Sequence, residues 1–389
     1  MALRGRRPSD RAAGQDRSRL HRLLSVAAWP ALALGALALV ALTLVSHLST
    51  PARHTLVVAA LPYWNIQTDT AVVLANRQDV NEVSPWIYGI SPSGAIVMQS
   101  TQGQAATTVA DMDKLRAAGM RIVPTIANIT NGKWAYQPID GILHNPALMR
   151  QHVSNIVTLA DREDYAGVDI DYEGLLASDR QVFSQFVAEL AAAMHAHGKI
   201  VTVDVFPQNS AAEAAGNPLD AAQDYAAIGR SADQVRVMAY NNHWANSPPG
   251  AVAPISWVRA VVKYTLTQVP ASKVVLGVPL YGFDWGDGPA QTISWLQALR
   301  LSRQYHVQPS YNNASQAPTF SYDAGGRSHV VWFENAASSA SKFYAVRGAG
   351  IAGTFLWMYG YEDPGTWPAL RQALPLSGPN ASSTSTAVP

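Results

Sequence analysis

The stretch "GVDIDYEG", residues 167–174, places three acids at alternate positions in an otherwise apolar run. Alternate side chains of a β-strand lie on the same face, so Asp169, Asp171 and Glu173 are predicted to point one way. The aliphatic and aromatic residues between them then point the other way. The stretch therefore predicts a strand with an apolar face packed on helices and an acidic face that lines the interior of a barrel.

This stretch is the fourth of eight short apolar runs that alternate with helix-like segments. The clearest helical segment is Ser178–His197, which Gly198 ends, and Asp111–Ala118 and Pro254–Leu266 have similar apolar spacing. Eight strands alternating with helices predict an α/β fold, a (β/α)₈ TIM barrel over residues 55–375, with its active site at the carboxyl ends of the strands. The eight runs are 55–64, 83–90, 121–129, 166–173, 199–207, 234–240, 273–282 and 350–360.

The connection between the seventh and eighth runs is too long for a single helix. It contains a helical piece, "ISWLQALRLSRQY" (293–305), and a hairpin pattern, "PTFSYDAGGRSHVVWF" (318–333). We therefore predict a small α+β insertion at about residues 283–347, beside the mouth of the barrel.

The N-terminal residues have the pattern of a membrane anchor. Residues 1–22 hold seven Arg against two Asp, and no Asp, Glu, Lys or Arg occurs from Leu23 to Ala52. An apolar stretch of about 20 residues can cross a bilayer, and a basic flank favours a cytoplasmic N-terminus. We predict a basic cytoplasmic leader (1–22) and a transmembrane signal-anchor (23–46), with the barrel outside the cell membrane. The alternative is a cleaved signal peptide and a secreted protein, although the apolar region of such a peptide is usually only about 7–15 residues.

The composition excludes several classes of function. The chain has no Cys, which excludes disulfides, Cys-based zinc sites and thiol catalysis. Outside the leader there are 21 Lys and Arg against 25 Asp and Glu, a net charge of −4, so no nucleic-acid partner is predicted. No cofactor and no metal are predicted either. The tail, residues 376–389, is rich in Ser, Thr, Pro and Ala and is predicted to be disordered.

The acidic row predicts a site for acid–base chemistry. Neighbouring acids on one strand face lie roughly 7 Å apart, and such a row in a low-dielectric interior cannot stay fully ionised. A proton is therefore held within the row, and Glu173, at the catalytic end, can serve as a general acid. Two plainer interpretations are a cation-binding strand end and salt bridges to the helical layer. The position on the fourth strand of eight favours the acid–base site.

The motif "AGVDIDYE" resembles the D-G-x-D-x-D-x-E signature of family 18 glycoside hydrolases, the chitinase-like barrels. The order and spacing of three further motifs fit the family from about residue 55 to 375, and "HVVWFENAASSASKF" (329–343) looks most like the bacterial branch that holds spore cortex-lytic glucosaminidases. The three motifs are "VMAYNNHW" (237–244, similar to M-x-Y-D), "VVLGVPLYGFDW" (274–285, similar to G-x-P-x-Y-G) and "GIAGTFLWMYGYEDPGTW" (350–367, similar to the last strand with its Trp).

The resemblance implies a retaining, substrate-assisted cleavage of β-1,4 bonds next to N-acetylated amino sugars. Glu173 would protonate the glycosidic oxygen while the substrate's own 2-acetamido oxygen closes to an oxazolinium ion. Asp171 would orient the acetamido N–H and stabilise the positive charge, with Asp169 behind it sharing the proton. Tyr240 would hydrogen-bond the acetamido carbonyl.

The resemblance also implies sugar contacts from apolar and aromatic residues. Met238 would pack near the acetamido methyl group and Trp357 would form the floor under the reacting sugar, although both could simply fill the barrel. Tyr63 and Trp64 end the first run. Because adjacent residues of a strand face opposite sides, only one of them is expected to touch sugar.

Three other residues carry open alternatives. Tyr281 and Trp285, at the end of the seventh run, are either further sugar contacts or core residues. Arg236 shares the strand face of Met238. It could neutralise the acidic row from below, but we do not favour this role.

Two positions depart from the family pattern. Ala166 replaces the first Asp of the signature, at the position farthest from the reacting bond, so its loss should alter packing or pKa and leave the chemistry in place. Asn241 replaces the Asp that follows Tyr240. It keeps hydrogen bonding and loses a charge, which affects the electrostatics of the acetamido pocket, where Asn241 is a candidate substrate contact.

Together these features predict an exported, membrane-tethered glycoside hydrolase. Its partner would be N-acetylglucosamine-containing polysaccharide, with peptidoglycan as the first substrate class and chitin oligomers as the second. The main rival is a catalytically silent, lectin-like sugar-binding barrel, and the presence of Glu173 favours the enzyme because lectin-like members of such families typically lack the acid. A third possibility is an accessory cell-surface domain for partner proteins.

Overall fold

The computed structural model describes residues 55–218 and 221–374. The basic leader (1–22), the predicted signal-anchor (23–46) and the tail (376–389) lie outside these residues. Among the helices of the described part, none is both long enough and apolar enough to span a membrane.

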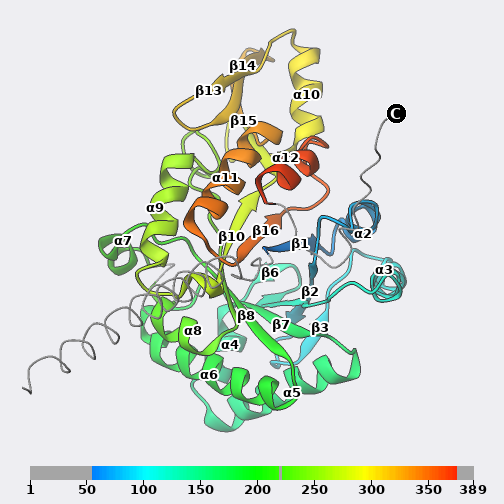
Figure 1. Ribbon diagram of the computed structural model, residues 1–389, viewed down its shortest axis with the longest axis vertical. Helices are drawn as coiled ribbons and strands as arrows, with labels where there is room; N and C mark the ends of the chain where they lie inside the picture. Colours follow the sequence, from blue (N-terminus) through cyan, green and yellow to red (C-terminus); the bar gives the residue numbers. More distant parts are fainter. Residues whose placement is uncertain (1–54, 219–220, 375–389) are drawn as a thin grey trace, which may run out of the picture. The chain divides into compact units, whose positions relative to one another are not determined.

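Eight parallel strands form a closed barrel, one at each of the eight apolar runs of the sequence (Figure 1). The predicted (β/α)₈ architecture is confirmed. The strands are β1 (Leu56–Pro62), β2 (Glu82–Ile90), β4 (Thr125–Ala127), β7 (Gly167–Asp171), β8 (Ile200–Val205), β9 (Gln234–Val237), β10 (Val274–Pro279) and β16 (Gly353–Trp357). They pair in the order β1-β16-β10-β9-β8-β7-β4-β2, and β1 pairs with β2 to close the ring. A short strand, β3 (Ile96–Met98), pairs antiparallel with β2.

Helices between the strands cover the outside of the barrel. The clearest predicted helix, 178–197, is α6 (Arg180–Ala196), and its buried stripe includes Phe183, Phe186 and Leu190. This stripe belongs to the same core as the outward-facing residues of β7. The other helices of the described chain outside the insertion are α2 (Ile66–Ala75), α3 (Ala105–Ala117), α4 (Tyr136–Leu143), α5 (Pro146–Arg162), α7 (Ala211–Gly216), α8 (Tyr225–Ser231), α9 (Ile255–Thr265), α11 (Ala336–Ala349) and α12 (Thr366–Ala373).

The inside of the barrel is divided into a polar and an apolar part. The strands β1, β10 and β16 contribute the apolar residues Val58, Ala60, Val275 and Phe355. The strands β2, β4, β7, β8 and β9 contribute buried polar residues, which are Glu82, Ser84, Thr125, Asp169, Asp171, Thr202, Asp204 and Arg236. The acidic row therefore faces a polar wall, where its carboxylates find hydrogen-bond partners.

The glycine that opens the acidic stretch is required by close strand packing. A Cβ atom at Gly167 would lie 2.3 Å from the carbonyl oxygen of Ile200 on the adjacent strand. Any side chain here would push β7 away from β8, and with it the acids that follow.

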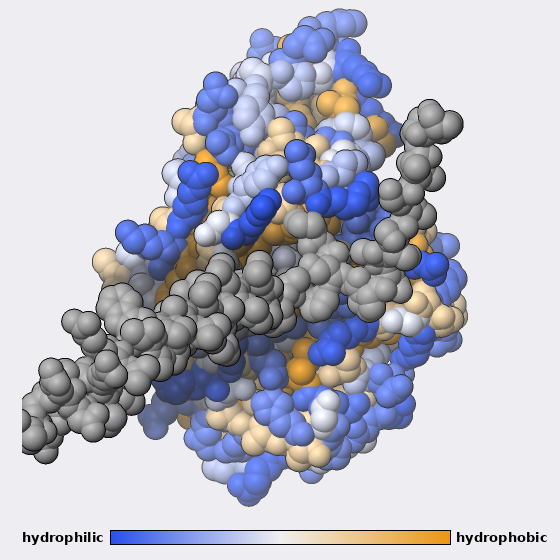
Figure 2. Space-filling view, in the orientation of Figure 1, coloured by the Kyte–Doolittle hydropathy of each residue, from blue (hydrophilic) through white to orange (hydrophobic). Residues whose placement is uncertain are grey.

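The predicted insertion between β10 and β16 is a five-stranded antiparallel sheet with one helix, and it lies at the top of Figure 1. Its elements are β11 (Tyr281–Trp285), β12 (Gln291–Ser294), α10 (Trp295–Gln304), β13 (Ser310–Asn312), β14 (Ala317–Ala324) and β15 (Arg327–Trp332). The predicted hairpin is β14–β15, joined by Gly325 and Gly326 with φ angles of 58° and 77°, as a two-residue type I′ turn requires. The surface over the insertion is mostly hydrophilic (Figure 2).

The insertion ends earlier in the chain than its predicted limit of about residue 347. That limit falls within α11, which packs against β10 and β16 and so belongs to the outer layer of the barrel. Helical spacing identifies an apolar face and cannot tell which sheet that face covers.

Candidate active site

A cavity of about 230 Å³ lies inside the barrel toward the carboxyl ends of its strands. Seven of the predicted site residues line it, including all four of the predicted catalytic residues. The complete lining is Ala60, Ser84, Trp86, Thr125, Trp134, Asp169, Asp171, Glu173, Asp204, Arg236, Met238, Tyr240, Asn241, Phe355 and Trp357. The predicted acidic face of β7 thus opens on a cavity that also presents aromatic side chains.

Glu173 lies two residues beyond the end of β7 and is held by a side chain from another strand end. The Asn128 side chain, just after β4, accepts the Glu173 N–H at 2.8 Å and donates to the Glu173 carbonyl at 2.8 Å. Burial raises the pKa of the Glu173 carboxyl well above its ordinary value, and the negative charge of Asp171 adds to the rise. Glu173 is therefore a carboxyl group suited to carry a proton near neutral pH.

Asp171 is buried and has one partnered and one unpartnered oxygen. The indole N–H of Trp86 donates to Oδ2 at 2.8 Å, while Oδ1 is buried and has no partner in the described part of the chain. Burial raises the pKa of Asp171 to about 7; the Trp86 donor opposes this rise, and Asp169 adds to it. An acceptor oxygen that is already dehydrated and unpartnered is prepared to bind an N–H of a ligand.

Asp169 lies deeper and is surrounded by donors. Thr125 donates to its Oδ2 at 2.9 Å, Thr202 donates a short hydrogen bond to Oδ1, and the Arg236 guanidinium lies 3.3 Å from Oδ1. Arg236 also donates to Glu82 Oε1 at 2.7 Å. The role that we did not favour for Arg236 is therefore the one that its geometry supports, since it is a buried cation between two carboxylates beneath the row.

Asp204 is a lining residue that the sequence analysis missed. It comes from β8, hydrogen-bonds Asp169 and has a buried, unpartnered Oδ1 in the described part of the chain. The signal was present, because "VTVDVFP" puts one acid among the valines of a predicted barrel strand. It was passed over because the acids were identified by their spacing of two residues, and a single acid shows no such spacing.

Tyr240, Met238 and Asn241 all reach the cavity from the segment that follows β9. Tyr281 donates its hydroxyl proton to Asn241 Oδ1 at 2.6 Å. Tyr281 is itself buried outside the cavity, so it orients Asn241 and is not placed for the direct sugar contact that was one of its two predicted alternatives. Asn241 has a φ of 58°, a left-handed conformation that Asn tolerates better than most residues.

Trp285 is not brought to the cavity. It is 4% exposed and donates its indole N–H to the carbonyl oxygen of Ser247 at 3.0 Å, which makes it a core residue under the insertion. Of its two predicted alternatives, the structure supports the core residue for Trp285. Its strand, β11, pairs with β12 and β15 of the insertion, and this long-range pairing was not visible in the spacing.

Aromatic rings gather at the mouth of the cavity, around Trp86. Tyr63 stacks on Trp86 with ring centroids 6.0 Å apart, and the rings of Trp64, Trp134 and Trp357 meet Trp86 at 5.6 to 6.3 Å. Trp64 is 41% exposed and Trp134 is 47% exposed. Of the first-run pair, Trp64 is thus presented to solvent while Tyr63 is partly buried. Both residues follow the last residue of β1 and both rings pack on Trp86, so the alternation expected of a strand does not extend to this pair. Trp86 and Trp134 were missed because neither sits in a quoted motif.

The two departures from the family pattern lie in different places. Ala166 lines a separate cavity of about 420 Å³ with Arg116, Arg121 and Lys199, before the first residue of β7. It is therefore far from Glu173 along the strand, whereas Asn241 lines the active cavity itself.

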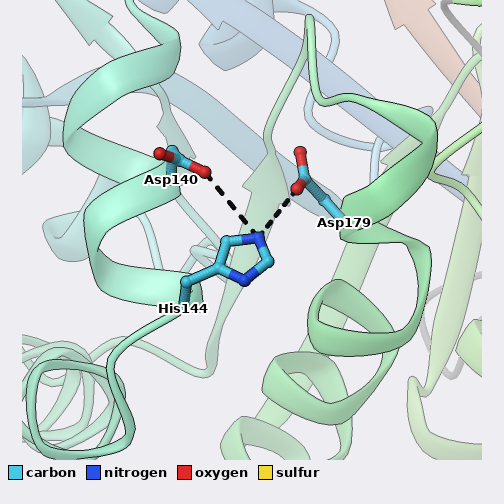
Figure 3. A group of neighbouring side chains, drawn as sticks. All are labelled: Asp140, His144 and Asp179. Atoms are coloured by element: carbon cyan, nitrogen blue, oxygen red, sulfur yellow. Dashed lines mark hydrogen bonds and ion pairs between the residues drawn. The ribbon is translucent and has the colours of Figure 1, made fainter.

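A second group of titratable side chains lies outside the cavity and joins α4 to the 3₁₀ turn Ala177–Asp179 (Figure 3). His144 Nε2 lies 2.9 Å from Asp179 Oδ1 and 3.7 Å from Asp140 Oδ1. Tyr136 donates to Asp140 Oδ1 at 2.9 Å, and the Leu176 N–H donates to Asp179 Oδ2 at 2.7 Å. These residues have the composition of a metal site, but the atoms that face one another, His144 Nε2, Asp140 Oδ1 and the Asp179 carboxylate, already have partners.

Comparisons with known proteins agree with this geometry. Residues 53–362 match the model of the glycosyl hydrolases family 18. The chain is 31% identical over 302 residues to the cortical fragment-lytic enzyme of Bacillus subtilis (strain 168), covering 75% of this chain and 69% of that relative. The crystal structure of a chitinase from Chromobacterium violaceum superposes with a TM-score of 0.76 at 30% identity, covering 82% and 99% of the two chains. That of the Bacillus cereus spore cortex-lytic enzyme SleL superposes with a TM-score of 0.74 at 26% identity, covering 82% and 75%.

Proposed function

The chain belongs to family 18 of the glycosyl hydrolases and is a glycoside hydrolase, and from this premise we propose that it cleaves β-1,4 bonds of N-acetylglucosamine-containing glycans by substrate-assisted, retaining catalysis. The observation that carries the proposal is the pairing of Glu173 with Asp171 in one cavity, where Asp171 keeps an unpartnered oxygen. A second carboxylate nucleophile is then not needed, because the substrate supplies its own.

In the first step Glu173 transfers its proton to the glycosidic oxygen and the bond from C1 to that oxygen breaks. The 2-acetamido oxygen forms a new bond to C1 from the opposite face, giving an oxazolinium ion and a free alcohol. In the second step water attacks C1 and gives its proton to Glu173, which opens the ring and restores both the acetamido group and the acid. Two inversions at C1 leave the configuration retained.

The other lining residues have roles that follow from their chemistry. Asp171 Oδ1 accepts the acetamido N–H and faces the positive charge that develops on the ring, so it acts best when ionised. Tyr240 donates to the acetamido oxygen, Met238 packs on the methyl group, and Trp357 stacks under the apolar face of the sugar. Asn241 offers the substrate an uncharged amide at the position where the family pattern has a charged Asp.

Peptidoglycan is the proposed first substrate class and chitin oligomers are the second. The names of the similar cortical fragment-lytic and spore cortex-lytic enzymes support the former, and the similar chitinase supports the latter. We further propose that residues 23–46 anchor the chain in the cell membrane with the barrel outside, where cell-wall glycan lies. Protease treatment of intact cells tests this orientation, because an external barrel is degraded and a cytoplasmic one is protected.

The full-length chain should be assayed on peptidoglycan and on chitohexaose side by side, with products separated by mass. Retention is read from the anomer formed first, using proton NMR. Replacing the acetyl group of an aryl chitobioside by trifluoroacetyl weakens the internal nucleophile and should slow turnover at least about tenfold. An unchanged rate, or an α-anomer as first product, would contradict the mechanism. Sugar binding without turnover of any of these substrates would favour the lectin-like alternative.

A further inference from the structure

Asp204 lies level with the catalytic part of the acidic row, on the neighbouring strand. The Ile170–Val203 pair of β7 and β8 puts the next residues, Asp171 and Asp204, side by side. On its other side Asp204 pairs in register with Arg236 of β9. Residues in register on adjacent parallel strands point to the same side of the sheet, so the side chains of Asp204 and Asp171 both face the interior cavity.

The surroundings of Asp204 contain more acid than base. Asp169 and Asp171 face it from β7, Arg236 faces it from β9, and Tyr240 lines the same cavity. Arg236 is the only cation among the described residues that line the cavity, and it is already shared between Glu82 and Asp169. A further charge on Asp204 would have no cation of its own to balance it.

The contacts of Asp204 fit a proton donor. It is 8% exposed and hydrogen-bonds Asp169, and two carboxyl groups can form such a bond only when one of them carries the proton. Asp169 already accepts from Thr125 and Thr202, which makes it the acceptor of the pair. Burial, and then the charges of Asp169 and Asp171, raise the pKa of Asp204 well above its ordinary value.

We propose that Asp204 is a positioning residue of this active site, a neutral carboxylic acid that donates its proton to Asp169 and leaves Asp171 as the ionised acceptor for the substrate. The proposal deepens the proposed function and rests on the role given there to Asp171. Asp204 contacts Asp169 of the acidic row and acts on the substrate only through that row. Its unpartnered Oδ1 keeps acceptor character toward the cavity.

Two substitutions separate a neutral donor from a charged acid. Asp204→Asn keeps the shape, the donor and the neutrality that we assign to Asp204. It should therefore retain kcat/KM within about threefold of wild type, with the acidic limb of the pH–rate profile unmoved. Asp204→Ala removes the donor, so the carboxylates of the row bind a proton more tightly. Its kcat/KM should fall at least about tenfold and its acidic limb should move to higher pH.

Two results would overturn the proposal. One is an Asp204→Asn variant as impaired as Asp204→Ala. The other is an acidic limb that moves to lower pH by about one unit in Asp204→Asn, because this would mean that a negative charge had been removed. A loss in Asp204→Ala with an unmoved limb also contradicts it, since that is the behaviour of a purely structural residue.

A second measurement does not depend on turnover. A neutral Asp204 in the folded chain is ionised in the unfolded chain above about pH 4, so wild type loses stability relative to Asp204→Asn as pH rises from there toward the folded pKa. The Tm of Asp204→Asn minus that of wild type should increase by at least about 3 °C between pH 5 and pH 8. The exposed Asp323→Asn on β14 is the control and should show a constant difference.

The two measurements keep the two proposals apart. If wild type turns over no glycan while the difference in Tm rises with pH, the proposed function fails and the neutral Asp204 stands. If wild type is active and Glu173→Gln is not, while the difference in Tm is flat or falls, the assignment of Asp204 is wrong and the proposed function stands.

Discussion

Trp86 donates its indole N–H to Oδ2 of Asp171 at 2.8 Å, so β2 supplies a donor to an acid on β7 across the strand between them. This donor lowers the pKa of Asp171 against the larger effect of burial, which raises it. The donor therefore widens the pH range in which Asp171 is ionised. The same ring is the centre of the aromatic cluster at the mouth, so one side chain both anchors that cluster and donates to the acid.

Trp86→Phe removes the donor and keeps an aromatic ring. The pKa of Asp171 should rise, which moves the acidic limb of the pH–rate profile to higher pH. At pH 6 we expect kcat/KM to fall about tenfold, the equivalent of about 1.4 kcal/mol for a lost hydrogen bond to a charged group. Trp367→Phe in α12 is the control and should leave the limb in place; an unmoved limb in Trp86→Phe would show that the indole N–H does not act on Asp171.

Glu173→Gln removes the proposed general acid and keeps the size of the side chain. Turnover of an aryl chitobioside should fall by about 10²–10⁴-fold, while the Tm and the quenching of Trp fluorescence by chitin oligomers stay near wild type. Glu189→Gln on α6 is the matched control and should be fully active. Persistent turnover in Glu173→Gln would sink the proposed mechanism.

Asn128→Ala removes both hydrogen bonds to the backbone of Glu173. We expect kcat to fall by about 10–100-fold through misplacement of the acid, with KM changed less than about threefold. The control is Asn145→Ala, which removes the N-cap of α5 and should cost about 1 kcal/mol of stability without affecting kcat. Equal loss of stability with unchanged kcat in both variants would mean that Asn128 does not position Glu173.

Arg236→Met leaves Glu82 and Asp169 buried without their shared cation. The free energy of unfolding, measured in urea, should fall by about 3–5 kcal/mol. Adding Glu82→Gln should recover part of this loss, because one of the two buried acids that lost Arg236 is then neutral; the recovery is only partial, since Glu82 keeps Arg121 as a partner at 2.9 Å. Arg327→Met breaks the exposed pair with Asp287 and should change stability by less than about 1 kcal/mol. Strictly additive losses in the double variant would argue against coupling of Arg236 with Glu82.

Chelation should leave this protein unchanged. The polar atoms of His144, Asp140 and Asp179 pair with one another and with neighbouring donors, so the group does not need an ion to stay together. Treatment with EDTA followed by gel filtration is expected to alter neither the Tm nor the initial rate. A Tm that drops and recovers with added Zn²⁺ or Mn²⁺, and that does neither in His144→Gln, would reveal a metal site here.

Local periodicity explains what could be predicted from the sequence. Eight apolar runs fixed the number and order of the barrel strands, and the period of two in one strand brought Asp169, Asp171 and Glu173 to one cavity. Both features are encoded within short segments. The extent of the insertion was less certain, since α11 has an apolar face that suits either layer.

The partners of the acidic row could not be predicted in the same way. Trp86 comes from β2, Asn128 from the position after β4 and Asp204 from β8, and their contacts depend on the register between strands. Arg236 was undervalued because a buried Arg is costly unless it is paired, and its partner Glu82 lies 154 positions away in the chain. Sequence spacing identifies which residues share a strand face, and only the closed sheet shows which faces meet.

The two hydrogen bonds between the Asn128 side chain and the backbone of Glu173 also bear on which parts of the barrel can vary in sequence. The β7 ladder stops at Asp171, yet the Asn128 side chain offers the Glu173 peptide one donor and one acceptor, the same pair that one more residue of a neighbouring strand would offer. The backbone of Glu173 is thus fixed to the barrel before the chain enters the 3₁₀ turn Ala177–Asp179. We therefore expect changes of sequence beyond Gly174 to leave these two backbone hydrogen bonds intact, so that the surface around the acid can vary while the acid stays in place.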